Sequence, residues 1–225
     1  MARGKAATFD LQRATILQAA ANLFAGKGFH NASMAELARA CGVSKPLLYH
    51  YYRDKDHMLF DIADSYMDQL LGIVAGVEAR DLEPRARLKA LIARFMEEYE
   101  HSQSQHVVLV QDVKFLQEGQ RELVLGKERK VVAAFAEVIE DIEPGLRRKR
   151  LDKAVAMILF GMINWTFTWL RAGGRMSYGD MAPVVTQIML NGVGGLSGHL
   201  DKRRKKLLPA HDKTMDSKLE RSGTT

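Results

Sequence analysis

A short stretch near the N-terminus, GVSKPLLYHYYRDKD over residues 42–56, concentrates basic and aromatic side chains. Its lysines can donate to guanine edges or to phosphates, and its tyrosines and histidine can donate to phosphate oxygens. Leu48 and Tyr52 stand four residues apart and are expected to face a core. The remaining side chains then point outward, and such a surface is costly unless a partner covers it. The residue types therefore indicate recognition of a polyanion.

Two short helices must position this stretch. Ser33 followed by Glu36 is a capping box that begins one helix, and that helix ends at Gly42, where a left-handed turn is cheap. Ser44 can cap a second helix over about residues 45–51. Two helices joined by such a tight turn form a helix-turn-helix, whose second helix lies in the major groove of DNA. The spacing therefore predicts DNA as the polyanion.

Longer helices flank this pair. Apolar residues recur at helical spacing from Ala14 onward, and Gly28 is expected to form a left-handed cap at the end of that first helix. Asp54 can cap a fourth helix, which we expect to run to about Val77 and to join this head to the rest of the chain. The N-terminal head is therefore predicted to consist of three helices, followed by a long connecting helix.

The candidate DNA contacts follow from the chemistry of the outward side chains. Lys45 can reach guanine or a phosphate, and Leu47 can contact a thymine methyl group. Phosphate oxygens are the expected acceptors for the other donors, which are Ser33, Tyr49, His50, Tyr51 and Lys55. An alternative is that the tyrosines only pack the small head, and Tyr52 is expected to do so.

Composition and charge support this interpretation. The chain has 225 residues, of which 47% are hydrophobic and 27% charged, and strand signals are sparse, so an all-α fold is predicted. Residues 1–55 carry a net charge of +5, residues 56–198 carry −3 and residues 199–225 carry +4. A basic head on a mildly acidic body is typical of nucleic-acid binding, although a solvated basic surface is the alternative.

Other classes of protein are disfavoured. The single cysteine, Cys41, allows neither an intramolecular disulfide nor a metal site of cysteine pairs, which suits a reducing cytoplasm. The most apolar run, residues 154–170, is short and interrupted for a membrane span and is expected to be a buried helix. Phosphate-binding loops, nucleophile elbows and paired metal-binding histidines are not found, so we expect neither an enzyme nor a metal site.

The stretch MAELARACGVSKPLLYHYYRDKDHML, together with the preceding TILQAAANLFAGKGFHNAS, resembles the DNA-binding head of the TetR family of bacterial transcriptional regulators. The resemblance covers roughly residues 10–60. It implies a cytoplasmic, helical homodimer on a palindromic operator, usually a repressor released by a small molecule. Carried over by position, the DNA contacts are Lys45, Pro46, Leu47, Tyr49, Tyr51 and Lys55, joined by Ser33, whereas His50 lies at a more variable position.

The remaining chain must dimerise and bind the effector. Helices are expected over about residues 85–100, 105–116, 121–142, 146–170 and 178–192, with Gly161 allowing close approach of another helix. Trp165 and Trp169 lie four residues apart on the penultimate helix, which can form a buried dimer seam, a ligand wall, or both. His106 near Asp112 is interpreted as incidental rather than as part of a catalytic triad.

Residues 105–195 also resemble the C-terminal domain of a TetR branch that responds to acyl-coenzyme A thioesters. This resemblance implies an acyl-CoA effector and control of a catabolic operon; the alternative is another apolar small molecule, and no other cofactor is expected. The phosphates would need basic residues such as Arg121, Lys127, Arg129, Lys130, Arg171 and Arg175. The candidate lining of the acyl tunnel is Phe95, Met96, Tyr99, Phe115, Met162, Trp165, Phe167 and Trp169.

The predicted organisation has three parts. Residues 1–55 form the helix-turn-helix DNA-binding domain, and residues 56–198 form a helical bundle for ligand binding and dimerisation. Residues 199–225, which begin with the basic run DKRRKK after a histidine and a leucine, are expected to be a disordered tail. That tail is either simply solvated or adds non-specific affinity for DNA.

Overall fold

A computed structural model describes residues 2–170 and 174–207, and side chains over residues 9–170 and 174–192. The described parts of the chain contain helices and no strand, which confirms the predicted all-α class. The elements are α1 (Ala2–Lys27), α2 (Met34–Ala40), α3 (Lys45–Tyr51), α4 (Lys55–Glu78), α5 (Pro84–His101), α6 (Gln103–Asp112), η1 (Val113–Phe115), α7 (Glu118–Ile142), α8 (Gly145–Arg148), α9 (Asp152–Asn164), η2 (Trp165–Thr168) and α10 (Tyr178–Leu207).

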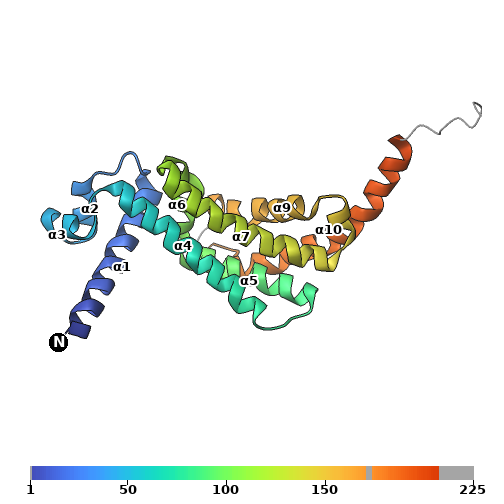
Figure 1. Cartoon of the computed structure of the whole chain (residues 1–225), viewed down its shortest axis with the longest axis horizontal. Helices are drawn as coiled ribbons and strands as arrows, with labels where there is room; N and C mark the ends of the chain where they lie inside the picture. Colours follow the sequence, from blue (N-terminus) through green and yellow to red (C-terminus); the bar gives the residue numbers. More distant parts are fainter. Residues whose placement is uncertain (1, 171–173, 208–225) are drawn as a thin grey trace, which may run out of the picture.

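The head forms one end of the molecule (Figure 1). The predicted capping box of α2 is present, since the Ser33 hydroxyl accepts from the Glu36 amide at 3.3 Å and the Glu36 carboxylate accepts from the Ser33 amide at 3.0 Å. Gly28 and Gly42 have φ of 86° and 66°, the left-handed conformation that glycine adopts without strain. The local sequence signals for the helix-turn-helix are therefore confirmed.

Helix α4 leaves the head and continues into the body (Figure 1). Asp54 caps it as predicted, accepting from the His57 amide at 2.8 Å. Its apolar face is continuous from Met58 to Val77 and packs first on α1 and then on α5, α6 and α7. Arg13 of α1 pairs with Asp61, so the helix is attached to the head by a charge pair as well as by packing.

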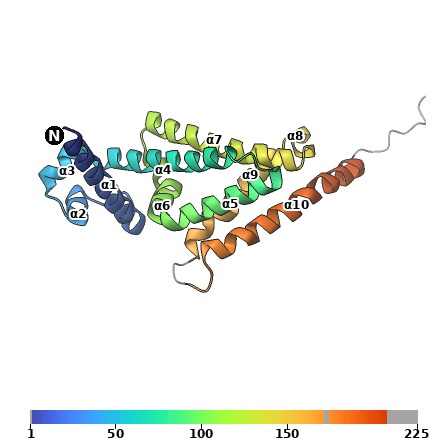
Figure 2. The ribbon, with the colours of Figure 1, turned by 90° about the horizontal axis from the view of Figure 1, so that it is seen from below.

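The body is a bundle in which α4 lies beside α7, α5 lies beside α10, and α9 lies against α7 (Figure 2). Aromatic rings interlock at its centre: Phe95 meets Phe135 edge-on with ring centroids 4.9 Å apart, and Phe135 meets Phe160 at 4.8 Å. Lys127 of α7 forms ion pairs of 2.6 Å with both Asp64 and Asp68 of α4. The bundle therefore holds α4 against α7 through packing and charge together.

The helix expected over residues 146–170 is interrupted twice. After the short α8, Arg150 adopts a φ of 56° and the Leu151 amide bonds back to the Leu146 carbonyl at 3.0 Å, which closes the helix as a Schellman-type end without glycine. At the other end, α9 tightens into η2, where the Thr166 hydroxyl donates to the Ile163 carbonyl at 2.6 Å. Serine and threonine side chains that bond the preceding turn commonly bend helices in this way.

The last helix is longer than expected. We predicted an end near residue 192 and disorder from residue 199, whereas α10 continues to Leu207. The basic run is rich in lysine and arginine, which are good helix formers, so it can extend a helix that is already nucleated by packing. The rest of the expected tail, residues 208–225, lies outside the described residues. Among the helices described, none combines the length and apolar character needed to cross a membrane.

Candidate nucleic-acid interface and effector cavity

The recognition surface is built on α3. Leu48 and Tyr52 are fully buried, as predicted, and they anchor the helix against the head. Lys45 and Pro46 are exposed, and Leu47 and Tyr49 remain 41% and 46% exposed. A seven-residue helix that leaves these apolar and basic side chains uncovered presents the surface that groove binding requires.

Two of the candidate contacts also pack within the head. The Tyr51 ring stacks on Phe9 of α1 with centroids 4.6 Å apart, and His50 meets Phe9 edge-on at 6.2 Å. Tyr51 is accordingly only half-exposed, whereas His50 is exposed. Part of the alternative is therefore observed, because Tyr51 and Tyr52 contribute to packing while Tyr49 stays outward.

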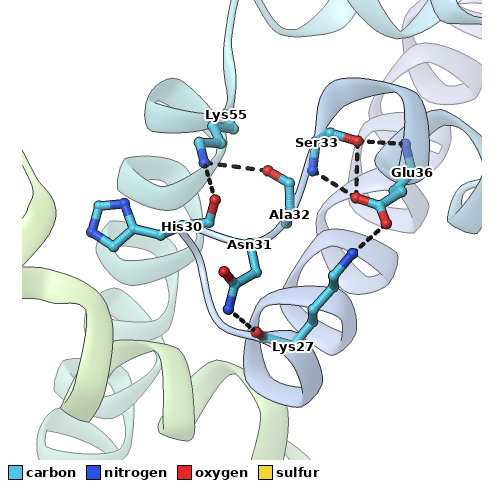
Figure 3. Close-up of polar contacts among 7 residues, drawn as sticks. All are labelled: Lys27, His30, Asn31, Ala32, Ser33, Glu36 and Lys55. Atoms are coloured by element: carbon cyan, nitrogen blue, oxygen red, sulfur yellow. Dashed lines mark hydrogen bonds and ion pairs between the residues drawn. The ribbon is translucent and has the colours of Figure 1, made fainter.

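Lys55, predicted to contact a phosphate, has partners within the head in this structure. Its Nζ donates to the carbonyl oxygens of Phe29, His30 and Ala32 at 3.0, 3.2 and 3.2 Å, which uses all three ammonium protons. It also lies 4.5 Å from the centroid of the Phe29 ring. Figure 3 shows the ammonium beside the carbonyl oxygens of His30 and Ala32, in the loop between α1 and α2. Residue type and spacing do not reveal these loop carbonyls, which compete with DNA for the same protons.

Ser33 is likewise engaged inside the head. Its hydroxyl donates to Glu36 Oε2 at 2.9 Å, and Glu36 also pairs with Lys27 (Figure 3). Hydrogen bonds from Lys27 and Ser33 lower the pKa of Glu36 to about 2. The hydroxyl proton predicted to reach a phosphate is therefore already used, although the side chain remains exposed beside the recognition surface.

The body encloses a cavity of about 400 Å³ between α4, α5, α6, α7 and α9, which we call the main cavity. Its lining is largely apolar, and its charged members are Lys114, Arg121 and Glu128. Neither Lys114 nor Arg121 forms an ion pair within the described part of the chain. An apolar cavity with a few charged groups is the usual form of a small-molecule site.

One wall of this cavity carries a buried polar cluster. Tyr99 donates to Asn164 Oδ1 at 2.7 Å, and its ring stacks on His106 with centroids 3.9 Å apart. His106 Nε2 donates to the Asn164 carbonyl at 3.2 Å, because a carbonyl can only accept. Burial lowers the pKa of His106 to about 4, so the ring is neutral at pH 7. Its Nδ1 is buried without a partner.

A second cavity, of about 420 Å³, lies where the head meets the body, and we call it the junction cavity. The loop between α1 and α2 forms one side of it, and α6, η1 and η2 form the other. His30 meets Phe115 with ring centroids 4.0 Å apart, and Phe29 stacks on Phe115 at 6.0 Å. The two cavities share Val110 and Lys114, so they adjoin along α6 and η1.

The predicted tunnel residues divide among these places. Phe95 and Tyr99 line the main cavity, whereas Phe115, Trp165 and Phe167 line the junction cavity. Three others line neither: Met96 is fully buried in the core, Met162 is half-buried and Trp169 is half-exposed. Trp169 follows the break at η2 and so no longer lies on the helical face assumed from its spacing, whereas Met96 lies in the core and Met162 packs against it.

The basic residues proposed for phosphates divide in the same way. Arg121 lines the main cavity, whereas Lys127 is held by its two aspartates and Arg129 pairs with Glu122. Lys130 and Arg175 are exposed and line neither cavity, and Arg171 lies outside the described residues.

Sequence reasoning missed Met67 and Leu70 of α4, and His106, as lining residues. His106 shares a helical face with Leu109, Val110 and Val113, which is a signal that could have placed it inward. It does not form a triad with Asp112, which lines the other cavity. Over the described residues, no three histidine, cysteine, aspartate or glutamate side chains are grouped as a metal ion would require.

A helix-turn-helix head with an uncovered recognition helix, joined by one long helix to a body containing an apolar cavity, defines a DNA-binding regulator. Residues 16–62 match the domain described as "Bacterial regulatory proteins, tetR family", and residues 81–193 match the "Tetracyclin repressor-like, C-terminal domain". The chain belongs to the TetR family of bacterial transcriptional regulators.

Three similar proteins are each matched over most of their length. The chain is 28% identical over 188 residues to the HTH-type transcriptional repressor KstR2 of Rhodococcus jostii (strain RHA1), covering 81% of this chain and 91% of that protein. A TetR-family regulator from Bordetella parapertussis 12822 is 34% identical with a TM-score of 0.76, covering 80% and 94%. AibR, whose structure is a complex with isovaleryl coenzyme A and operator DNA, has a TM-score of 0.69 at 23% identity, covering 79% and 97%.

Proposed function

We propose that this chain is a cytoplasmic homodimeric repressor that binds a palindromic operator and is released by an acyl-CoA thioester, so that it controls a catabolic operon. The observation that carries the proposal is the arrangement along α4, which begins at the recognition head and whose Met67 and Leu70 line the main cavity. A ligand in that cavity therefore touches the helix that positions the head.

In the operator complex, α3 enters the major groove. Lys45 reads a guanine or a phosphate, Leu47 contacts a thymine methyl group and Tyr49 donates to the phosphate backbone. Lys55 acts indirectly, by holding the loop that leads into α2. Two heads about one turn of DNA apart, roughly 34 Å, bind the two half-sites.

The dimer forms through α9 and α10, which lie against each other in the body. Ile158 is 62% exposed, and Val184 and Ile188 of α10 are also exposed. Gly161 lies three residues after Ile158 with open space where a Cβ would stand. This apolar surface, Ile158, Gly161, Val184 and Ile188, supports a four-helix seam between two copies.

The effector is proposed as an acyl-CoA thioester because an apolar cavity adjoins unpaired basic side chains, Lys114 and Arg121. The isovaleryl coenzyme A bound by AibR supports the same class, and the name of the KstR2 relative supports repression. The alternative effector is an apolar molecule without the coenzyme, which the main cavity alone would accommodate.

Release requires that the ligand bind the conformation with misplaced heads more tightly than the operator-bound one. Filling the main cavity displaces α4 or α6, and both helices contact α1 in the head. The spacing between the two recognition helices then changes, and the operator contacts are lost together.

A mobility-shift assay with the DNA upstream of the gene, in the presence of acyl-CoA thioesters and of the matching free acids, tests this function. We expect a specific shift that one thioester abolishes and its free acid does not. A specific shift that no thioester changes would exclude the acyl-CoA effector, and the absence of any specific shift with upstream DNA would argue against repression of a neighbouring operon.

A further inference from the structure

The junction cavity has features that the proposed release mechanism does not use. Aromatic rings form much of its wall, and Trp165 is 62% exposed there although it is the largest apolar side chain of the region. Phe167 lies beside it, with ring centroids 6.0 Å apart. Exposed aromatic rings around a cavity are suited to stack on a planar ligand, and bases of every kind present such a face.

The junction cavity also contains two charged side chains, Asp112 and Lys114. Within the described residues, no hydrogen bond or ion pair is found for the Asp112 carboxyl or for the Lys114 ammonium, and Lys114 lies 5.0 Å from the Phe115 ring centroid. Asp112 is buried, and burial raises the pKa of its carboxyl, whereas the nearby charges of Lys114 and His30 act to lower it. The cavity thus offers an acceptor for an amino group and a cation for a phosphate beside the aromatic rings.

The position of Lys114 relates this cavity to the effector. Lys114 and Val110 stand one helical turn apart and line both cavities, so a ligand extending from the main cavity past these side chains enters the junction cavity. A thioester of coenzyme A has this sequence of chemistry: an apolar acyl group, a flexible arm and a phosphorylated aminopurine nucleotide. Free adenine nucleotides carry the same terminal chemistry without the acyl group.

We propose that the junction cavity binds the adenine nucleotide end of the effector, with the base stacked on Trp165, its amino group donating to Asp112 and its phosphates facing Lys114. This inference rests on the proposed acyl-CoA effector. It places the nucleotide against Phe29 and His30, the loop that leads into α2 and that Lys55 holds. The nucleotide then acts on the DNA-binding head by direct contact, in addition to any movement of α4.

The test uses the full-length protein with three probes: octanoyl-CoA, octanoyl-N-acetylcysteamine, which lacks the nucleotide, and 3′-phospho-ADP, which lacks the acyl group. Binding is measured by calorimetry with wild type, Trp165→Ala and Lys114→Gln. Trp169→Ala and Lys130→Gln are the matched controls, because these residues line neither cavity. Sedimentation of each variant verifies that its oligomeric state matches wild type.

We expect Trp165→Ala and Lys114→Gln each to weaken octanoyl-CoA about tenfold, in line with the loss of one stacked base or one phosphate contact. Binding of octanoyl-N-acetylcysteamine should be unchanged, and the control variants should bind both thioesters like wild type. In a Trp169→Phe background, where Trp165 is the remaining tryptophan, octanoyl-CoA and 3′-phospho-ADP should quench its fluorescence and the truncated thioester should not.

The outcomes separate this site from the proposed effector. Equal loss of both thioesters in Trp165→Ala, or no loss of either, would overturn the nucleotide site while leaving the acyl-CoA effector in place. Quenching by 3′-phospho-ADP with no binding of either thioester would support the site and contradict the proposed effector. Failure of all three probes to bind would overturn both.

Discussion

The Lys55 ammonium donates to three carbonyls of the loop before α2, and substitution of Lys55 separates this structural role from a direct phosphate contact. Lys55→Met removes a charged donor from three loop carbonyls, so we expect the free energy of unfolding to fall by about 1–3 kcal/mol. Operator affinity should fall with it, because the loop before α2 loses its support. Thermal and urea unfolding measure the first effect, and binding across salt concentrations measures the second.

Lys45→Met is the matched comparison, since Lys45 is exposed and its nearest described interaction is with the Tyr49 ring, at 5.9 Å. It should unfold like wild type while its operator affinity and salt dependence both decrease. If Lys55→Met instead kept wild-type stability and lowered only the salt dependence, Lys55 would be a phosphate contact after all.

The lowered pKa of His106 predicts how the stability of the protein depends on pH. Its pKa is lowered to about 4 in the folded protein by burial, compared with an ordinary value of 6.5. As the pH falls below 6.5, the unfolded chain therefore binds a proton at His106 before the folded chain does. This difference lowers the free energy of unfolding between pH 6.5 and 4, by up to about 3 kcal/mol. Urea unfolding from pH 7.5 to 4.5 should show a steeper loss in wild type than in His106→Gln. Parallel curves would mean that His106 takes up its proton at the same pH in the folded and the unfolded chain.

At the scale of elements, α9 and α10 carry the proposed dimer surface. Ile158→Glu places a carboxylate in the centre of an apolar seam, and we expect monomers at micromolar concentration, with specific operator binding weakened together with dimerisation. Leu123→Glu is the control, because Leu123 of α7 is 60% exposed but outside this surface, so it should remain dimeric. Sedimentation velocity distinguishes the two, and an Ile158→Glu protein that stays dimeric would contradict the seam.

Element boundaries show where sequence reasoning succeeded and where it stopped. Ser33, Gly42, Ser44 and Asp54 specify their caps and turns within a few residues of chain, so the head was predictable. The left-handed backbone conformation of Arg150 could not be predicted in the same way. A non-glycine residue is held in that conformation by hydrogen bonds that only the folded turn supplies.

The candidate sites were predictable to a similar degree. Residue type and helical spacing identified Leu47 and Tyr49 as outward and Phe95 and Tyr99 as cavity lining. Helical spacing placed Trp169 in the cavity wall as well, but this residue lines neither cavity, since η2 changes the helical period just before it. Spacing also could not reveal the partners of Lys55 within the head, because they come from a loop more than twenty residues earlier in the chain.

For the molecule as a whole, the proposed dimer makes operator affinity depend on the spacing between the two half-sites. Moving one half-site by five base pairs turns it to the opposite face of the duplex, where the second head cannot reach it. We expect affinity to fall toward the non-specific level, about 10³-fold or more. Mobility shifts with the natural and the lengthened operator measure this effect. A dimer that tolerated the insertion would have independently mobile heads.

The attachment of the head to the body has a consequence for engineered chimaeras. The expected boundary at residue 55 divides a structure that is continuous: Arg13 pairs with Asp61, Phe29 stacks on Phe115, and His30 meets the Phe115 ring edge-on. A head transplanted onto another regulator's effector domain at that boundary would lose its charge partner and face a foreign aromatic surface. A graft that keeps DNA specificity and responsiveness together must carry α4 at least through Asp61 and recreate the contact at Phe115, so exchange among regulators is restricted to bodies with a matching junction.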